Sequence, residues 1–151
     1  MGIKIISDNR KAAFKFHFLE KIEAGLVLTG SEVKSLRAGR VNLGDAYAVL
    51  KGEELFLLNC HISPYPPAAG QNHEPLRTRK LLLHRNQIER LIGKLREKGL
   101  TLVPTKLYFK EGRAKVELAV AKGKKLFDKR ETIKKREAKR AISRVIKSRN
   151  K

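Results

Sequence analysis

The chain has 151 residues, of which 35 are Lys or Arg and 15 are Asp or Glu, so its formal net charge at pH 7 is +20. A hydrophobic fraction of 41% is enough for a core, while no apolar run reaches the roughly 20 residues of a membrane helix and the first residues lack a secretory signal. Cys60 is the single cysteine and excludes an internal disulfide. We therefore expect one soluble cytoplasmic domain with a tail, whose partner is a polyanion rather than a membrane.

The first half of the chain predicts two strands, a short helix and a β-hairpin. In chain order these cover residues 14–18, 24–30, 31–39 and 46–59. Phe14, Phe16 and Phe18 alternate with polar residues, as on a half-buried strand. Ser31 is placed to cap the helix and Gly39 to end it. A glycine-bearing connection separates the two apolar runs of the hairpin.

The second half predicts a loop, a strand, a longer helix and a second hairpin. These cover residues 64–75, 81–83, 86–98 and 101–120. The loop holds four of the five prolines, so we expect it to be long and exposed. The helix has apolar residues at helical spacing and stops at Gly99. About six strands in antiparallel neighbours, with two helices, predict a mainly β fold: an OB-like antiparallel β-barrel with flanking helices.

The last fifth of the chain is a basic tail. Residues 122–151 carry 14 basic and 3 acidic side chains, a net of +11, whereas residues 1–121 carry 21 and 12, a net of +9. We therefore divide the chain into a body, 1–121, and a tail, 122–151. Residues 138, 141, 142 and 145 form a thin apolar stripe at helical spacing, but like charges four residues apart oppose a free helix. We expect the tail to be disordered alone and helical against a polyanion.

The sequence carries no catalytic motif. No glycine-rich loop follows a strand and opens a helix, and the four histidines lack metal-ligand spacing. Asp45, Glu53 and Glu54 suggest a metal-dependent nuclease, but a solvated turn is the better interpretation of the two glutamates. We expect no enzymatic activity, no cofactor and no metal.

Three short basic segments are candidate RNA-binding sites. They hold Arg77, Arg79 and Lys80 after the proline-rich loop, Lys122, Lys124 and Lys125 at the end of the last strand, and Asn9, Arg10 and Lys11 near the start. Arg offers bidentate phosphate contacts and Lys a point charge. The alternatives are a solvated charge run and, for the second segment, a flexible hinge. With three Tyr and no Trp, we expect recognition of folded RNA by shape and backbone rather than extensive base stacking.

Four segments, in order along the chain, resemble the bacterial SsrA-binding protein (SmpB) family. They are residues 23–30 (EAGLVLTG), 32–39 (EVKSLRAG), 77–84 (RTRKLLLH) and 121–125 (AKGKK), the last followed by the Asp-Lys-Arg string of residues 128–130. The likeness runs from about residue 9 to residue 130 and continues as a basic tail.

The resemblance implies an OB-like barrel and a non-catalytic role in trans-translation, the rescue of stalled ribosomes. Members bind the tRNA-like domain of transfer-messenger RNA (tmRNA) and help deliver it to the ribosome. There the tail probes the decoding centre and the empty mRNA channel of the small subunit, and folds as a helix. The implied partners are tmRNA and the ribosome, with alanyl-tRNA synthetase and elongation factor Tu acting alongside. We expect the chain to act as a monomer.

The resemblance also assigns site residues. Those on the RNA-binding surface are Asn9, Glu23 and Leu82, with Lys34 and Arg37 from the second matching segment. Those in the ribosome-binding tail are Asp128, Lys129 and Arg130, with Ile142, Val145 and Ile146 on the apolar side of its helix. Phe127 stands where some relatives have His or Tyr, which retains stacking but loses a hydrogen bond.

Two other functions fit the composition. A ribosomal or ribosome-assembly protein also joins a globular body to a basic extension. A metal-dependent nuclease would cleave RNA until a chelator is added. The ordered motifs favour the tmRNA-binding function over both.

Overall fold

The computed structural model describes residues 2–68, 72–96, 99–124, 130 and 133–142. Along the chain the named elements are β1 (Ile3–Asp8), α1 (Arg10–Lys15), β2 (Phe16–Leu26), α2 (Gly30–Arg37), β3 (Val41–Asn42), β4 (Tyr47–Lys51), β5 (Glu54–Leu58), β6 (His61–Ile62), a 3-10 turn (Pro66–Ala68), β7 (Arg79–Leu82), α3 (Arg85–Leu95), β8 (Leu100–Lys110) and β9 (Arg113–Gly123). Residues 133–142 are also helical.

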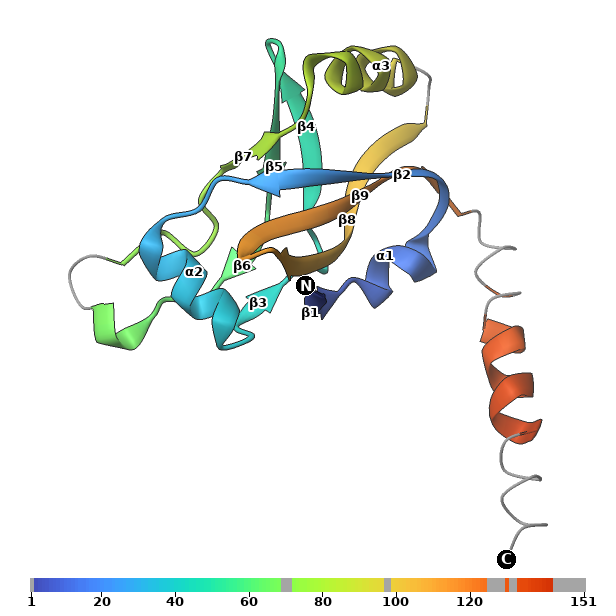
Figure 1. Ribbon diagram of the computed structural model, residues 1–151. Helices are drawn as coiled ribbons and strands as arrows, with labels where there is room; N and C mark the ends of the chain where they lie inside the picture. Colours follow the sequence, from blue (N-terminus) through green and yellow to red (C-terminus); the bar gives the residue numbers. More distant parts are fainter. Residues whose placement is uncertain (1, 69–71, 97–98, 125–129, 131–132, 143–151) are drawn as a thin grey trace, which may run out of the picture.

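Six antiparallel strands close into a ring. Their order is β8-β4-β5-β7-β2-β9, and β9 pairs with β8 again to complete the circle. β1 adds to the outer edge of β8, and the two-residue strands β3 and β6 form a separate pair. Figure 1 shows α1 and α2 near opposite ends of β2, with α3 beside the tip of the β4–β5 hairpin. The mainly β, barrel-like prediction with short flanking helices is confirmed.

The core lies inside the ring, where alternate residues of the strands meet. β9 contributes Val116, Leu118 and Val120, each at most 1% exposed. The other large apolar side chains that are almost fully buried there come from β5, β7 and β8: Leu55, Leu57, Leu81, Leu102 and Leu107. Strand side chains point alternately inward and outward, and on the outer side Val103, Ala119 and Ala121 are covered by Ala12 and the partly buried Phe16 and Phe18, while the other outward residues are open to partners. This alternation decides which charged residues a partner can reach.

The N-terminal strand prediction is partly wrong. Phe14 lies in α1, and β2 begins at Phe16, so only part of the aromatic alternation belongs to the strand. The helix forms because Asn9 is its N-cap: Asn9 Oδ1 accepts a hydrogen bond from the backbone N–H of Ala12 at 3.1 Å. β1, which precedes this helix, was not predicted.

The α2 prediction has the right helix but the wrong cap. Thr29 is the N-cap and forms a reciprocal capping box with Glu32, whose Oε1 accepts a hydrogen bond from the Thr29 backbone N–H at 2.8 Å. Ser31 instead lies buried, with its Oγ 2.8 Å from Nδ1 of His73. Gly39 adopts a φ of +72° just beyond the helix, as expected for a residue that ends one.

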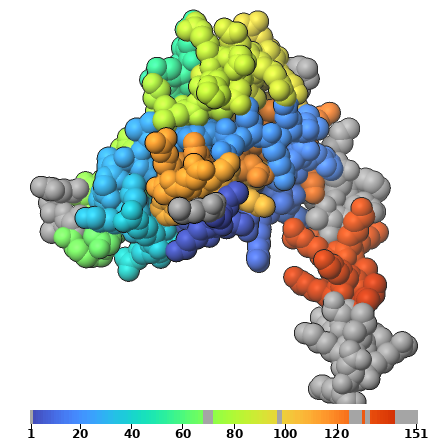
Figure 2. Space-filling view, in the orientation of Figure 1, coloured from blue at the N-terminus to red at the C-terminus, as the bar shows by residue number. Residues whose placement is uncertain are grey.

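The proline-rich loop is anchored rather than wholly exposed. Besides Ser31, the ring of His73 contacts the carbonyl oxygen of Ile62 through Nε2 at 2.8 Å, and only 9% of His73 is exposed. Both predicted hairpins are confirmed, as β4–β5 and β8–β9. The predicted helix over 86–98 is α3, and Gly99 has a φ of +85°. In the space-filling view α3 stands above β2 as a separate ridge (Figure 2).

We predict that Thr29→Ala lowers the free energy of unfolding by about 1 kcal/mol, because the variant loses one half of the capping box. Urea denaturation followed by circular dichroism measures this. Thr78→Ala is the matched control, since Thr78 is exposed and lies outside the named elements, and its effect should stay within about 0.5 kcal/mol. Equal effects of the two substitutions would contradict the capping assignment.

Candidate nucleic-acid interface

A buried cluster of charges fixes the segment that carries the strongest basic motif. Glu32 and Arg79 form an ion pair with both side chains fully buried. Arg77, whose side chain is 33% exposed, binds the same carboxylate, with Nη2 2.6 Å from Oε1 of Glu32. Arg79 also donates Nη1–H to the carbonyl oxygen of Cys60 at 2.6 Å and Nη2–H to that of Pro75 at 3.1 Å. The guanidinium is thus held by one carboxylate and by carbonyl groups from two segments.

Two opposing effects set the pKa of Glu32. Burial raises this pKa, while hydrogen bonds from Arg77, from the Thr29 backbone and from Arg79 lower it, and the net pKa lies below the ordinary 4.5. Glu32 is therefore ionised at neutral pH, and its charge is needed inside the fold to balance Arg79.

The interpretation of Arg79 as a phosphate contact is corrected by its burial. In β7, Arg79 and Leu81 point inward, whereas Lys80 and Leu82 point outward. A side chain with no exposed surface and a satisfied guanidinium cannot reach RNA without unfolding its surroundings. Lys80 remains on the surface, with Nζ 3.1 Å from Oε1 of Glu54.

Two of the residues assigned by resemblance meet in one surface hollow. Glu23 on β2 and Leu82 on β7 line it, together with Gly25, Leu83, His84, Gln87 and Lys115. Its volume is about 450 Å³, and 52% of Leu82 is exposed beside it. Strand pairing brings these residues together, because Gly25 lies opposite Leu82 on one side and opposite Lys115 on the other.

Hydrogen bonding keeps the carboxylate in this hollow ionised. Tyr108 donates its hydroxyl hydrogen to Oε2 of Glu23, which lowers the pKa of Glu23, while burial acts in the opposite direction. The ammonium group of Lys110, 3.6 Å from Oε1, lowers the pKa further. Burial and the charge of Glu23 raise the pKa of Tyr108 in turn.

The hollow offers three kinds of contact to a folded RNA. The Glu23 carboxylate accepts hydrogen bonds from amino groups on base edges or from ribose hydroxyls. Leu82 presents an apolar surface to a base or a sugar, and Lys115 supplies a cation for phosphate. Sequence reasoning missed Lys115, His84 and Gln87. Lys115 could have been found from the sequence. It precedes Val116 and lies two residues before Glu117 in a long alternating strand, so its side chain points to the side opposite that of Val116.

A second basic surface lies at the other end of β2. The backbone N–H of Lys124 donates to the carbonyl oxygen of Lys15 at 2.8 Å, and Lys122 lies opposite His17, so the end of β9 runs beside α1. Arg10 and Lys11 are exposed on α1, and Nζ of Lys11 is 2.6 Å from Oδ1 of Asp45. We call Arg10, Lys11, Lys122 and Lys124 the α1–β9 patch.

Asn9 supports this patch from within the fold, and its assignment as an RNA contact stays a prediction. It is 6% exposed, and besides capping α1 its Nδ2 donates hydrogen bonds to the carbonyl oxygens of Leu43 at 3.0 Å and Pro104 at 2.8 Å. Its polar atoms are occupied within the fold. What Asn9 does is fix the start of the helix on which Arg10 and Lys11 lie.

The remaining assigned residues are scattered or undescribed. Lys34 and Arg37 are exposed on α2, and Nζ of Lys34 lies 5.6 Å from the centre of the Tyr65 ring. Arg130 and Ile142 are exposed, and Ile142 is 62% exposed in the helical segment 133–142. Lys125, Phe127, Asp128, Lys129, Val145 and Ile146 lie outside the described residues. The division at residue 121 and the tail's disorder when alone stay predictions; β9 itself runs to Gly123.

Among the described residues, no group of three or more His, Cys, Asp or Glu side chains is arranged to hold a metal ion. The three acidic residues considered for a nuclease have other neighbours: Asp45 pairs with Lys11, Glu53 with Arg85 and Glu54 with Lys80. Of the helices that the structure describes, none is both long and apolar enough to cross a membrane.

Comparison with known proteins gives consistent matches. The family model described as "SmpB protein" matches residues 6–148. An SsrA-binding protein of Trichodesmium erythraeum (strain IMS101) is 58% identical over 147 residues, covering 97% of this chain and 94% of that protein. One from Syntrophomonas wolfei subsp. wolfei (strain DSM 2245B / Goettingen) is 60% identical over 149 residues, covering 99% and 95%.

The fold matches a solved structure as well. A chain of the structure described as "tmRNA-SmpB: a journey to the center of the bacterial ribosome" has a TM-score of 0.68 and 50% sequence identity, covering 80% of this chain and 85% of that one. The similarity is therefore one of sequence and fold together.

The lowered pKa of Glu32 predicts acid sensitivity. Its ionised form is favoured by folding, so its contribution to stability is present above pH 4.5, the ordinary pKa, and is lost as the pH falls through the lowered value. We predict that Glu32→Gln lowers the free energy of unfolding by about 3–5 kcal/mol at pH 7, because it leaves Arg79 buried without a counter-charge. Denaturation curves measured at several pH values test both statements.

The control for this prediction is Glu54→Gln, which removes an exposed pair with Lys80 and should change the free energy of unfolding by less than about 1 kcal/mol. The difference in stability between the wild type and Glu32→Gln should shrink as the pH is lowered. A difference that stays constant into acid would show that the Glu32 charge does not stabilise the fold.

Proposed function

The chain belongs to the SmpB protein family, and we propose that it binds tmRNA and acts with it in the rescue of stalled ribosomes. The observation that carries the proposal is the match of the family model over residues 6–148, together with relatives at 58–60% identity along nearly the whole chain. The basic composition fits an RNA partner but fits a ribosomal protein equally. The family match favours the tmRNA-binding function.

The hollow beside Glu23 and Leu82 is the proposed contact with the tRNA-like domain of tmRNA. It combines a hydrogen-bond acceptor, an apolar surface and a cation on rigid strands, which suits a structured RNA whose bases and riboses are presented in a fixed geometry. Strand pairing holds these groups in place before RNA arrives, so little ordering entropy is lost on binding. The contact needs no catalytic group, and we propose that the protein acts as a binding factor rather than an enzyme, in the cytoplasm where ribosomes work.

The α1–β9 patch and the tail form the proposed contact with the ribosome. The patch lies where β9 ends, so it adjoins the start of the basic tail. Each phosphate that these cations neutralise releases counterions, so binding through this surface weakens steeply with salt. The described side chains from residue 133 to residue 142 are all exposed, and the guanidinium of Arg136 lies 5.6 Å from the centre of the Phe14 ring on α1, so packing against the body stabilises this helix only weakly. We propose that it is stabilised by the phosphates of the empty mRNA channel.

We predict that Leu82→Ala weakens binding to the tRNA-like domain of tmRNA about five- to tenfold without lowering the melting temperature. Leu82 is 52% exposed, so its loss removes an interface contact and leaves no core cavity. Filter binding at fixed salt measures the affinity. Leu19→Ala is the matched control: Leu19 is 58% exposed, lies on β2 outside the hollow, and should leave affinity unchanged. Equal losses in both variants would move the interface elsewhere.

Deleting residues 131–151 separates the two proposed surfaces. We expect affinity for isolated tmRNA to stay within about twofold, because the hollow is intact, while tagging of stalled translation products is lost because the channel contact is missing. Binding and tagging are measured on the same preparation. Normal tagging by the truncated chain would contradict the role of the tail.

A further inference from the structure

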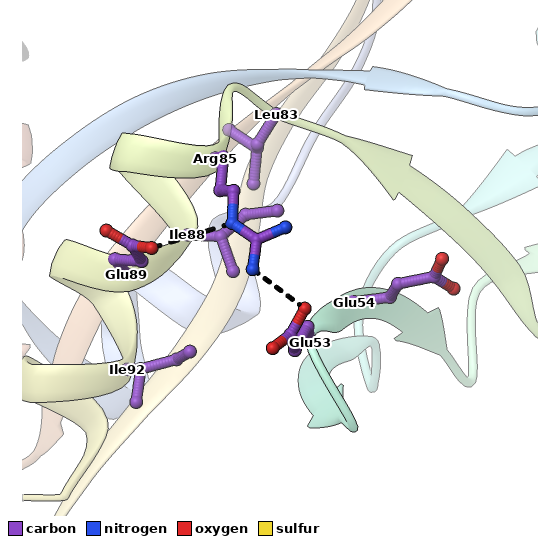
Figure 3. A pocket seen from close by; sticks show the side chains of 7 residues that line it. All are labelled: Glu53, Glu54, Leu83, Arg85, Ile88, Glu89 and Ile92. Atoms are coloured by element: carbon purple, nitrogen blue, oxygen red, sulfur yellow. Dashed lines mark hydrogen bonds and ion pairs between the residues drawn. The ribbon is translucent and has the colours of Figure 1, made fainter.

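A second hollow lies between the turn of the β4–β5 hairpin and α3. It has a volume of about 260 Å³ and is lined by Glu53, Glu54, Leu83, Arg85, Ile88, Glu89 and Ile92. Figure 3 shows Glu53 projecting from the hairpin turn towards α3, with the Arg85 guanidinium between Glu53 and Glu89. The walls therefore come from two elements that are separate in sequence, the β4–β5 hairpin and α3.

The floor of this hollow is aliphatic. Leu83 and Ile88 are partly buried and pack against the core. Leu91 of α3 lies within the core and is 2% exposed. Ile92 is partly exposed and lies on the side of α3 that lines the hollow. Such a half-covered apolar surface, bounded by polar groups, can receive an aliphatic side chain from a partner.

The rim is acidic, against the charge of the whole chain. Glu53, Glu54 and Glu89 set three negative charges against Arg85 in the lining and against Lys80, whose Nζ lies 3.1 Å from Oε1 of Glu54, so the local net charge is −1 in a chain of net +20. Phosphates would be repelled here, which makes the hollow unsuited to RNA. A segment rich in Lys and Arg has the complementary charge.

Glu53 and Glu89 both pair with Arg85, through ion pairs that are exposed to solvent. The Glu53–Arg85 pair spans 3.0 Å and the Arg85–Glu89 pair spans 3.6 Å, but all three side chains are at least 68% exposed. Exposed pairs of this kind contribute little to stability and exchange readily with water. An incoming cation can therefore replace Arg85 on either glutamate without disrupting the fold.

We propose that this hollow docks a basic segment of another protein, with an aliphatic side chain on the floor and Lys or Arg side chains on Glu53, Glu54 and Glu89. This surface adjoins the one around Glu23 and Leu82, since Leu83 lines both and α3 contributes to both, but its other lining residues are its own. The two hollows differ in charge, and in this proposal each therefore binds a different kind of partner: RNA beside Leu82 and a basic protein beside Ile92.

The proposal is tested by an NMR titration of the full-length, isotope-labelled chain with a short peptide. The peptide is rich in Lys and carries Leu residues at regular intervals. We expect chemical-shift changes concentrated at Glu53, Ile88 and Ile92, which line this hollow and not the one beside Leu82. A copy of the peptide with Ser in place of Leu should bind at least about fivefold more weakly, because it lacks the aliphatic anchor. This measurement needs neither tmRNA nor ribosomes, so its failure is separate from failure of the proposed function.

Variants of the chain distinguish the hollow from general charge attraction. The triple substitution Glu53→Gln, Glu54→Gln and Glu89→Gln should weaken binding at least about tenfold, and Ile92→Ser about fivefold. The control triple, Glu74→Gln, Glu111→Gln and Glu137→Gln, removes the same charge from exposed positions elsewhere and should weaken binding less than about twofold. Equal weakening by the two triples, or equal affinity for the Ser peptide, would overturn the proposal.

Two further titrations exclude other occupants. If deletion of residues 131–151 alone shifts the resonances of Glu53 and Ile92, the chain's own tail occupies the hollow and a separate protein partner is ruled out. If the tRNA-like domain of tmRNA shifts those resonances directly and competes with the peptide, the hollow binds RNA and the proposal is wrong. We expect neither change at these residues.

Discussion

The buried ion pair between Glu32 and Arg79 is the constraint on which the rest of this structure depends. Glu32 belongs to α2 and Arg79 begins β7, so the pair ties a helix to a strand that lies 47 residues further along the chain. Arg79 also donates hydrogen bonds to the carbonyl oxygens of Cys60, just before β6, and of Pro75, at the end of the proline-rich loop. A buried charge pair is worth little in net stability, but either charge alone would be very unfavourable, so the register of β7 is specified.

That register creates the surface proposed for tmRNA. With Arg79 inward, strand alternation turns Leu82 outward and brings it opposite Gly25. A Cβ atom at position 25 would lie 3.2 Å from Cβ of Leu82, tighter than ordinary van der Waals contact, so glycine permits the close approach of β2 and β7. The hollow beside Glu23 thus follows from the buried Glu32–Arg79 pair and from the absence of a side chain at Gly25. Its two motif residues are brought together by structure rather than by sequence proximity.

Regular patterns in the sequence predicted the hairpins, α3 and the mainly β ring, because each follows from local periodicity and turn chemistry. Two features escaped such reasoning for physical reasons. Phe14 continues an aromatic alternation, yet tertiary hydrogen bonds of Asn9 to Leu43 and Pro104 favour a helix there. Arg79 belongs to a cationic string typical of an RNA contact, and its burial depends on a carboxylate far away in sequence. In the structure Arg79 points inward with Leu81, but the run of three leucines at residues 81–83 hid this alternation in the sequence.

The distribution of charge over the body gives a chain of net +20 a physical means of distinguishing the two kinds of partner proposed for it. Uniform positive charge would attract any polyanion to any face. In the hollow proposed for tmRNA, Glu23 places a carboxylate beside Lys110 and Lys115, a combination that favours an RNA with hydrogen-bond donors as well as phosphates. In the hollow beside Ile92 the three glutamates outnumber the nearby cations Arg85 and Lys80, a charge balance that disfavours phosphate groups. Salt screens attraction and repulsion alike. At low ionic strength, charge should therefore decide which of the two hollows a partner binds, whereas at high ionic strength the shape and hydrogen bonding of each hollow should decide it.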